Sequence, residues 1–70
     1  MIDFDDLNVE QPSEWAIRRA SYAGSASSFV ALALASGYDG RVTGWSFEPA
    51  MARVLAHELI RCADAIDNAN

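Results

Sequence analysis

The sequence predicts a small α+β domain: an antiparallel β-meander of two or three strands, followed by one C-terminal helix packed on the sheet. Three observations support this fold class. Residues 28–36 alternate between two sets of apolar side chains, which is typical of a strand. Glycine-containing turn segments flank them at residues 24–27 and 37–40. Residues 48–67 instead repeat their apolar side chains at helical spacing.

The first strand is predicted from Trp15 to Tyr22. On a helix, Trp15 and Ile17 would lie about 200° apart, whereas on a strand they share one face. Ser13 and Gly24 are residues that begin and end helices, so a helical interpretation of this segment stays open.

The central strand, residues 28–36, is apolar on both faces. Val30, Leu32 and Leu34 share one face, and the other face holds Phe29, Ala31, Ala33 and Ala35. Such a strand needs cover on both sides. Because one helix covers one face, we expect a homodimer whose interface includes Phe29, Ala31 and Ala33.

Alanine and leucine also favour helix, which leaves an alternative fold: a small all-α bundle with helices near residues 13–23, 27–36 and 49–67. In the favoured fold, residues 41–47 form the third strand and complete the meander. This strand places Thr43, Trp45 and Phe47 on one face. We expect Trp45 in the core, and Tyr38, in the preceding turn, exposed.

The C-terminal helix is the best-defined element. Pro49 suits the first helical turn and Glu48 suits the N-cap. One continuous apolar stripe runs along the helix, formed by Met51, Ala52, Leu55, Ala56, Leu59, Cys62, Ala63 and Ile66. The opposite face holds Arg53, His57, Arg61 and Asp64. Residues 68–70 are expected to fray.

Charge divides the chain into an acidic arm and a neutral body. The net charge is −5, and five of the ten acidic residues lie within the first fourteen positions, with no base among them. We therefore predict an acidic N-terminal arm over residues 1–12 and a single domain over residues 13–67. A neutral body lacks the positive field on which phosphate binding depends, so nucleic acid is not the expected partner.

The motif "HELIRC", residues 57–62, begins like a zinc-protease signature. A zinc site of that type needs a second histidine four residues after the first, and here Arg61 occupies that position. Cys62 falls in the apolar stripe, on another face from His57, so the two cannot share a metal ion and Cys62 is expected to be buried. No serine elbow or phosphate loop is present either. We predict no catalytic, cofactor-binding or metal-binding residue, and no enzyme.

A single cysteine excludes an internal disulfide and fits a reducing compartment. The apolar run at residues 29–35 is too short to span a bilayer, and its flanks fit a signal peptide poorly. We therefore expect a cytoplasmic protein without membrane association.

The arm is the best candidate for a binding segment. Acidic residues alternating with apolar ones form short segments that become ordered on a partner. We predict that Phe4, Asp5, Asp6 and Leu7, together with the exposed Tyr38, contact a protein partner. The alternative is a nucleic-acid-associated accessory protein, which would use Arg18, Arg19 and Arg41.

The segment "GWSFEPAMARVLAHELIRCADAID", residues 44–67, resembles the C-terminal part of small α+β proteins of actinobacteria and their phages. In that group a strand leads into Leu-(Ser/Thr)-Pro-x-x-Ala-Arg-x-Leu-Ala and an alanine- and leucine-rich helix. The matching residues are Phe47, Pro49, Ala52, Arg53, Leu55, Ala56, Leu59, Ala63 and Asp64. Glu48 replaces the usual Ser/Thr cap. The resemblance implies a small accessory protein of unassigned function, whose partner would be a host or phage protein.

Overall fold

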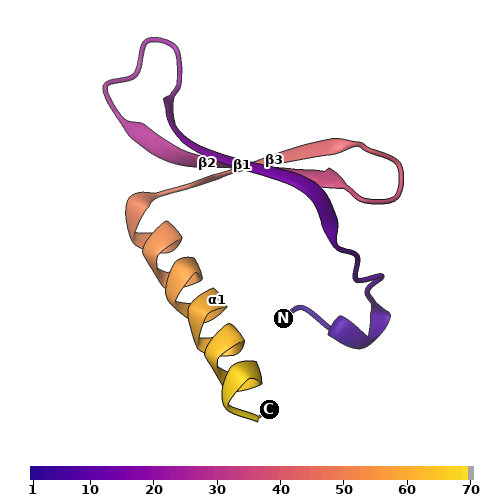
Figure 1. Ribbon diagram of the computed structural model, residues 1–70. Helices are drawn as coiled ribbons and strands as arrows, with labels where there is room; N and C mark the ends of the chain where they lie inside the picture. The colour runs from indigo at the N-terminus through magenta and orange to yellow at the C-terminus, as the bar shows by residue number, and fades with distance from the viewer. Residues whose placement is uncertain (70) are drawn as a thin grey trace.

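A computed structural model describes residues 1–69. The elements are, in chain order, a short 3-10 helix η1 (Phe4–Asp6), strands β1 (Pro12–Ser21), β2 (Ser28–Ser36) and β3 (Val42–Phe47), and helix α1 (Pro49–Ala69). The predicted α+β fold is confirmed: a three-stranded antiparallel meander precedes one helix that contacts the sheet (Figure 1). The all-helical alternative for residues 13–23 and 27–36 is wrong.

The sheet has the order β1-β2-β3, so each strand pairs with its neighbour in sequence. Ile17 lies opposite Leu32 on β2, and Leu32 lies opposite Trp45 on β3. β2 has the bounds that its alternation predicted. β1 begins earlier than predicted, at Pro12, with an irregular register between Pro12 and Glu14.

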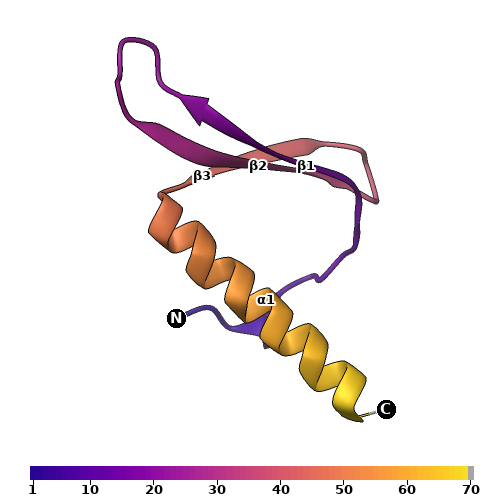
Figure 2. The ribbon, with the colours of Figure 1, turned by 60° about the vertical axis from the view of Figure 1, so that its left-hand side comes forward.

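The register divides the sheet into two faces. The helix-side face carries Trp15, Ile17, Arg19, Val30, Leu32, Leu34, Thr43, Trp45 and Phe47. The alanine face carries Glu14, Ala16, Arg18, Ala20, Phe29, Ala31, Ala33, Ala35, Val42, Gly44 and Ser46. The helix and the N-terminal arm both lie on the helix-side face (Figures 1 and 2). Within residues 1–69, no helix or strand covers the alanine face.

Helix α1 starts where the sequence predicted. The backbone N–H of Ala52 donates to the carbonyl of Glu48 at 2.9 Å, which places Glu48 at the N-cap ahead of Pro49. The helix extends to Ala69, the last described residue, two residues beyond the predicted end at residue 67. Residues 68 and 69 of the predicted frayed end are therefore helical, and Asn70 lies outside the described residues.

The axis of α1 diverges from the sheet. Figures 1 and 2 show the start of the helix close to the end of β3 and its C-terminal end far from every strand. The helix contacts β2 and β3. Between them lies an apolar cleft of about 140 Å³. Its walls are Ile17, Val30, Leu32 and Phe47 of the sheet and Ala52, Leu55, Ala56 and Leu59 of the helix.

No side chain of the described chain is fully buried. The Cα radius of gyration is 14.8 Å, whereas a compact domain of this length would have about 11 Å. Two predictions of burial are consequently wrong. Cys62 is exposed, because the helix has already left the sheet at that point. Trp45 remains 46% exposed, because α1 covers the other end of the helix-side face.

Candidate functional site

The acidic arm holds a preformed turn. Asp3 caps it: the N–H of Asp5 donates to the Asp3 side-chain oxygen Oδ1 at 3.0 Å. The N–H of Leu7 donates to the carbonyl of Phe4 at 3.2 Å and closes the turn. Aspartate suits this position because its short carboxylate reaches the backbone two residues on. The arm therefore has local structure without help from the body.

Four of the predicted partner-binding residues come together on this turn. They are Phe4, Asp5, Asp6 and Leu7, all exposed. Phe4 is 70% exposed and Leu7 48% exposed, and η1 contacts neither the strands nor α1. The turn thus presents two apolar side chains beside two carboxylates to solvent.

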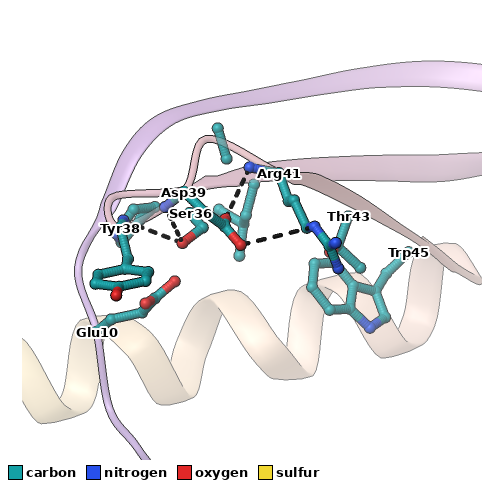
Figure 3. A pocket seen from close by; sticks show the side chains of 10 residues that line it. Glu10, Ser36, Tyr38, Asp39, Arg41, Thr43 and Trp45 are labelled. Atoms are coloured by element: carbon teal, nitrogen blue, oxygen red, sulfur yellow. Dashed lines mark hydrogen bonds and ion pairs between the residues drawn. The ribbon is translucent and has the colours of Figure 1, made fainter.

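Tyr38, the fifth predicted partner-binding residue, lies at the base of the arm. It is 92% exposed, as predicted for a turn residue. The hydroxyl oxygen of Ser36 accepts hydrogen bonds from the backbone N–H groups of Tyr38, at 3.1 Å, and Asp39, at 3.4 Å. Glu10 lies beside the ring of Tyr38 (Figure 3). Tyr38 therefore borders the arm but does not belong to its turn.

The β2–β3 turn is fixed by Asp39 and Arg41. The N–H of Arg41 donates to Asp39 Oδ1 at 3.0 Å, and the Arg41 guanidinium lies 3.7 Å from Asp39 Oδ2 (Figure 3). Gly40 has φ +73°, a conformation that glycine adopts without strain. This turn and the helix-side face together line an open hollow of about 390 Å³, whose apolar part includes Leu34, Thr43 and Trp45.

The three arginines of the nucleic-acid alternative do not form one patch. Arg18 and Arg19 are adjacent on β1, so their side chains leave opposite faces of the sheet. Arg19 donates to the hydroxyl of Ser28 at 3.3 Å. Arg41 lies at the other end of the sheet, where its carbonyl accepts from the N–H of Ser36 at 2.8 Å. No single surface presents all three guanidinium groups.

In the "HELIRC" segment, Arg61 forms an ion pair. It donates to Glu58 Oε2 from Nη2 at 2.9 Å and from Nε at 3.1 Å. This hydrogen bond, followed by the positive charge of Arg61, lowers the pKa of Glu58. The same pair raises the pKa of Arg61. Arg61 also lies 3.7 Å from Cys62 Sγ. Within residues 1–69, no group of three or more His, Cys, Asp or Glu side chains has metal-site geometry.

The predicted dimer-interface residues Phe29, Ala31 and Ala33 share the alanine face and are half-buried. Tyr22 partly covers this face: its ring stacks on Phe29 with centroids 4.6 Å apart, and its hydroxyl lies 3.4 Å from Ser46 Oγ. The role of Tyr22 was not predicted, although Tyr22 directly follows β1 and continues the alternation that puts Ala20 on this face.

The apolar cleft beneath the sheet was also missed. Its signal was present in the sequence, because the apolar stripe of the helix runs from Met51 to Ile66 and is longer than a contact with one small sheet needs. What the stripe could not show is the angle between helix and sheet.

Comparison with known proteins adds no further assignment. No protein-family model matches the sequence, and no similar chain is found among the curated proteins or the solved structures. The resemblance of residues 44–67 to small actinobacterial and phage proteins stays a prediction. Among residues 1–69, no helix is long and apolar enough to cross a membrane.

Proposed function

We propose that this chain is a small, non-enzymatic protein-interaction module that docks on a protein partner through its acidic arm. The observation that carries the proposal is the capped turn of the arm, which holds Phe4 and Leu7 exposed next to Asp5 and Asp6. Ordering a flexible segment costs free energy on binding, and a turn already closed by Asp3 reduces that cost.

The chemistry of the arm defines the partner. Two exposed apolar side chains favour a shallow apolar groove, and the neighbouring carboxylates favour basic residues at its rim. Tyr38 at the base of the arm adds an aromatic contact, since tyrosine offers a large apolar surface with few rotatable bonds. A partner of this kind is a protein with a basic rim around an apolar groove, from a host or a phage.

A nucleic-acid role is the weaker alternative. Phosphate binding needs several positive groups on one surface. Here Arg18 and Arg19 leave opposite faces of β1, and Arg41 is paired with Asp39. The free thiol of Cys62 fits a reducing compartment, so we place this interaction in the cytoplasm.

The test is affinity capture with the full chain, followed by a binding titration with the captured protein after purification. The double variant Phe4→Ser/Leu7→Ser removes both apolar contacts of the turn and should weaken binding at least about tenfold, because each buried side chain of this size contributes on the order of 1.5–3 kcal/mol. Val9→Ser is the control, since Val9 is also apolar and exposed but lies outside the turn.

The salt dependence of the titration gives the second readout. Asp5→Asn should slow association and reduce its sensitivity to salt, because rim charges act mainly on the association rate. Equal binding by the wild-type chain, the double variant and Val9→Ser would contradict the arm as the contact surface. Salt-sensitive binding to DNA that Arg18→Ala removes would support the nucleic-acid alternative instead.

A further inference from the structure

The helix-side face of the sheet is covered at one end only. The first half of α1 contacts it through the cleft residues Ala52, Leu55, Ala56 and Leu59. At the other end, Leu34, Thr43 and Trp45 line the open hollow beside the β2–β3 turn (Figure 3), and no residue of Pro49–Ala69 is among those that line it. The chain therefore presents an apolar sheet surface without its second layer.

The second half of α1 carries apolar side chains that have no sheet of their own chain to pack against. The apolar stripe continues past Leu59 through Cys62, Ala63 and Ile66. Ile66 is 62% exposed and Cys62 is exposed, and this half of the helix points away from the sheet (Figure 2). At the rise of an α-helix, the residues after Leu59 extend for about 15 Å. That length matches about half of a nine-residue strand such as β2.

We propose that a second copy of this chain fills the hollow, in a homodimer with a two-fold axis. The second half of α1 of each copy lies under Leu34, Thr43 and Trp45 of the other. A two-fold interface uses the same patch of both subunits, so each chain must offer both halves of the contact. This chain does so, because it has one overhanging helix segment and one uncovered sheet end.

The exposed area of the chain is large enough to supply a homodimer interface. The chain exposes 6468 Å², whereas a compact folded chain of its mass would expose about 4,300 Å², which leaves an excess of about 2,200 Å². The extended arm contributes part of that excess. Obligate homodimers bury at least about 2,000 Å² in total, or about 1,000 Å² per subunit. The chain as a whole therefore exposes enough surface for a stable dimer.

The alanine face is the other candidate for the dimer interface, and it offers less apolar area for burial. Most of its side chains are no larger than a methyl or hydroxymethyl group, so their burial removes little apolar area. Antiparallel sheets commonly leave one face in water. Trp15, Leu34 and Trp45 lie on the helix-side face instead. The larger gain therefore comes from the helix side and not from the interface predicted at Phe29, Ala31 and Ala33.

Light scattering coupled to size exclusion tests this proposal with the full chain and three variants. Ile66→Asp places a charge in the overhanging stripe, beyond the residues that contact its own sheet, and should give a folded monomer. Val54→Asp is the matched control, because Val54 is as exposed but lies on the outer side of the helix, and it should stay dimeric. Ala31→Glu should also stay dimeric.

A wild-type monomer at high micromolar concentration would overturn the proposal. So would a monomeric Ala31→Glu beside a dimeric Ile66→Asp, since that pair of results assigns the dimer to the alanine face. None of these variants changes the arm, so partner capture through the arm succeeds or fails independently of them.

If Ile66→Asp fails to fold, chemical modification of the Cys62 thiol in the wild-type chain tests the proposal instead. Cys62 lies in the overhanging stripe, so its modification rate in the wild-type chain should fall at least about tenfold between dilute and concentrated protein as the dimer forms. A rate that does not change with concentration would contradict the placement of this helix segment in the interface.

Discussion

At the scale of single residues, Gly37 decides how the arm enters the sheet. The backbone of Gln11 crosses the β2–β3 turn so closely that a Cβ built on Gly37 would lie 2.5 Å from the Gln11 carbonyl oxygen. No real side chain fits at that distance, and the neighbour is backbone, which cannot turn aside. Glycine at position 37 is therefore required by the close approach of two backbones and not by a turn conformation.

Substitution of Gly37 tests this contact. Gly37→Ala should destabilise the chain by about 1–3 kcal/mol, the usual cost of overpacking, because β1 or the turn must move. Urea unfolding measures the change. Gly44→Ala is the control, since its added Cβ would lie 3.8 Å from the Leu32 carbonyl oxygen, an ordinary contact distance. Equal midpoints for the two variants would rule out the close approach at Gly37.

The ion pair between Glu58 and Arg61 predicts a pH dependence of α1. Because Arg61 lowers the pKa of Glu58, the pair stabilises the folded helix above the ordinary glutamate pKa of 4.5, and this contribution is lost as the pH falls through the lowered value. Both groups are exposed, so the effect is small. Circular dichroism from pH 7 downward should show less helix loss in Glu58→Gln than in the wild-type chain.

A double-mutant cycle identifies the partner of Glu58. If Arg61 alone lowers the pKa of Glu58, then Arg61→Gln should remove the same pH-dependent change, and the double variant should add nothing further. A pH dependence that persists in Arg61→Gln would assign the effect to another charge.

At the scale of elements, the sequence specified the strands and the helix through two different periodicities. The alternation of residues 28–36 defined β2 because polar serines, Ser28 and Ser36, stand at both ends of the apolar run. Pro49 fixed the start of α1, since proline fits only the first helical turn. The ends of β1 were less well predicted, because its bulge near Pro12 depends on pairing with Ser36, which local sequence does not encode.

The cleft residues determine how firmly α1 is held. Leu55→Ala should cost about 2 kcal/mol, the lower end for a core leucine, because Leu55 lines the cleft but is only half-buried. Val54→Ala should cost under about 0.5 kcal/mol, because Val54 is 61% exposed on the outer side of the helix. Thermal unfolding of both variants measures the difference. Similar losses of stability in the two variants would mean that the cleft side of the helix does not hold α1 to the sheet.

At the scale of the whole molecule, the sequence could not give the angle between α1 and the sheet. A helical wheel shows which residues share a face, but not what stands opposite them. The expected burial of Cys62 failed for this reason, and Trp45 stayed partly exposed because the helix lies against Val30 and Phe47 instead. The turn of the arm at Phe4–Asp6 was not predicted, although Asp3 is a residue type that caps such turns.

Removal of residues 2–10 separates the proposed self-association of the chain from its proposed binding to a protein partner. If α1 and the sheet carry the self-association as proposed, the truncated chain should keep the dimeric mass of the full chain, and it should lose partner capture. Light scattering and the binding titration provide the two readouts. A monomeric truncated chain would instead show that the arm holds the two subunits together, and the arm could not then be a free docking segment.

The strand order β1-β2-β3 also has a kinetic consequence. Every strand pairing joins neighbours in sequence, and α1 contacts the two strands that precede it, so no pairing between elements needs a crossover connection. Pairing between elements that are neighbours in sequence favours fast folding. The meander should therefore form within one chain before two chains meet. Refolding should show a rapid phase that is independent of protein concentration, then a slower phase whose rate rises with concentration as the helices dock between subunits.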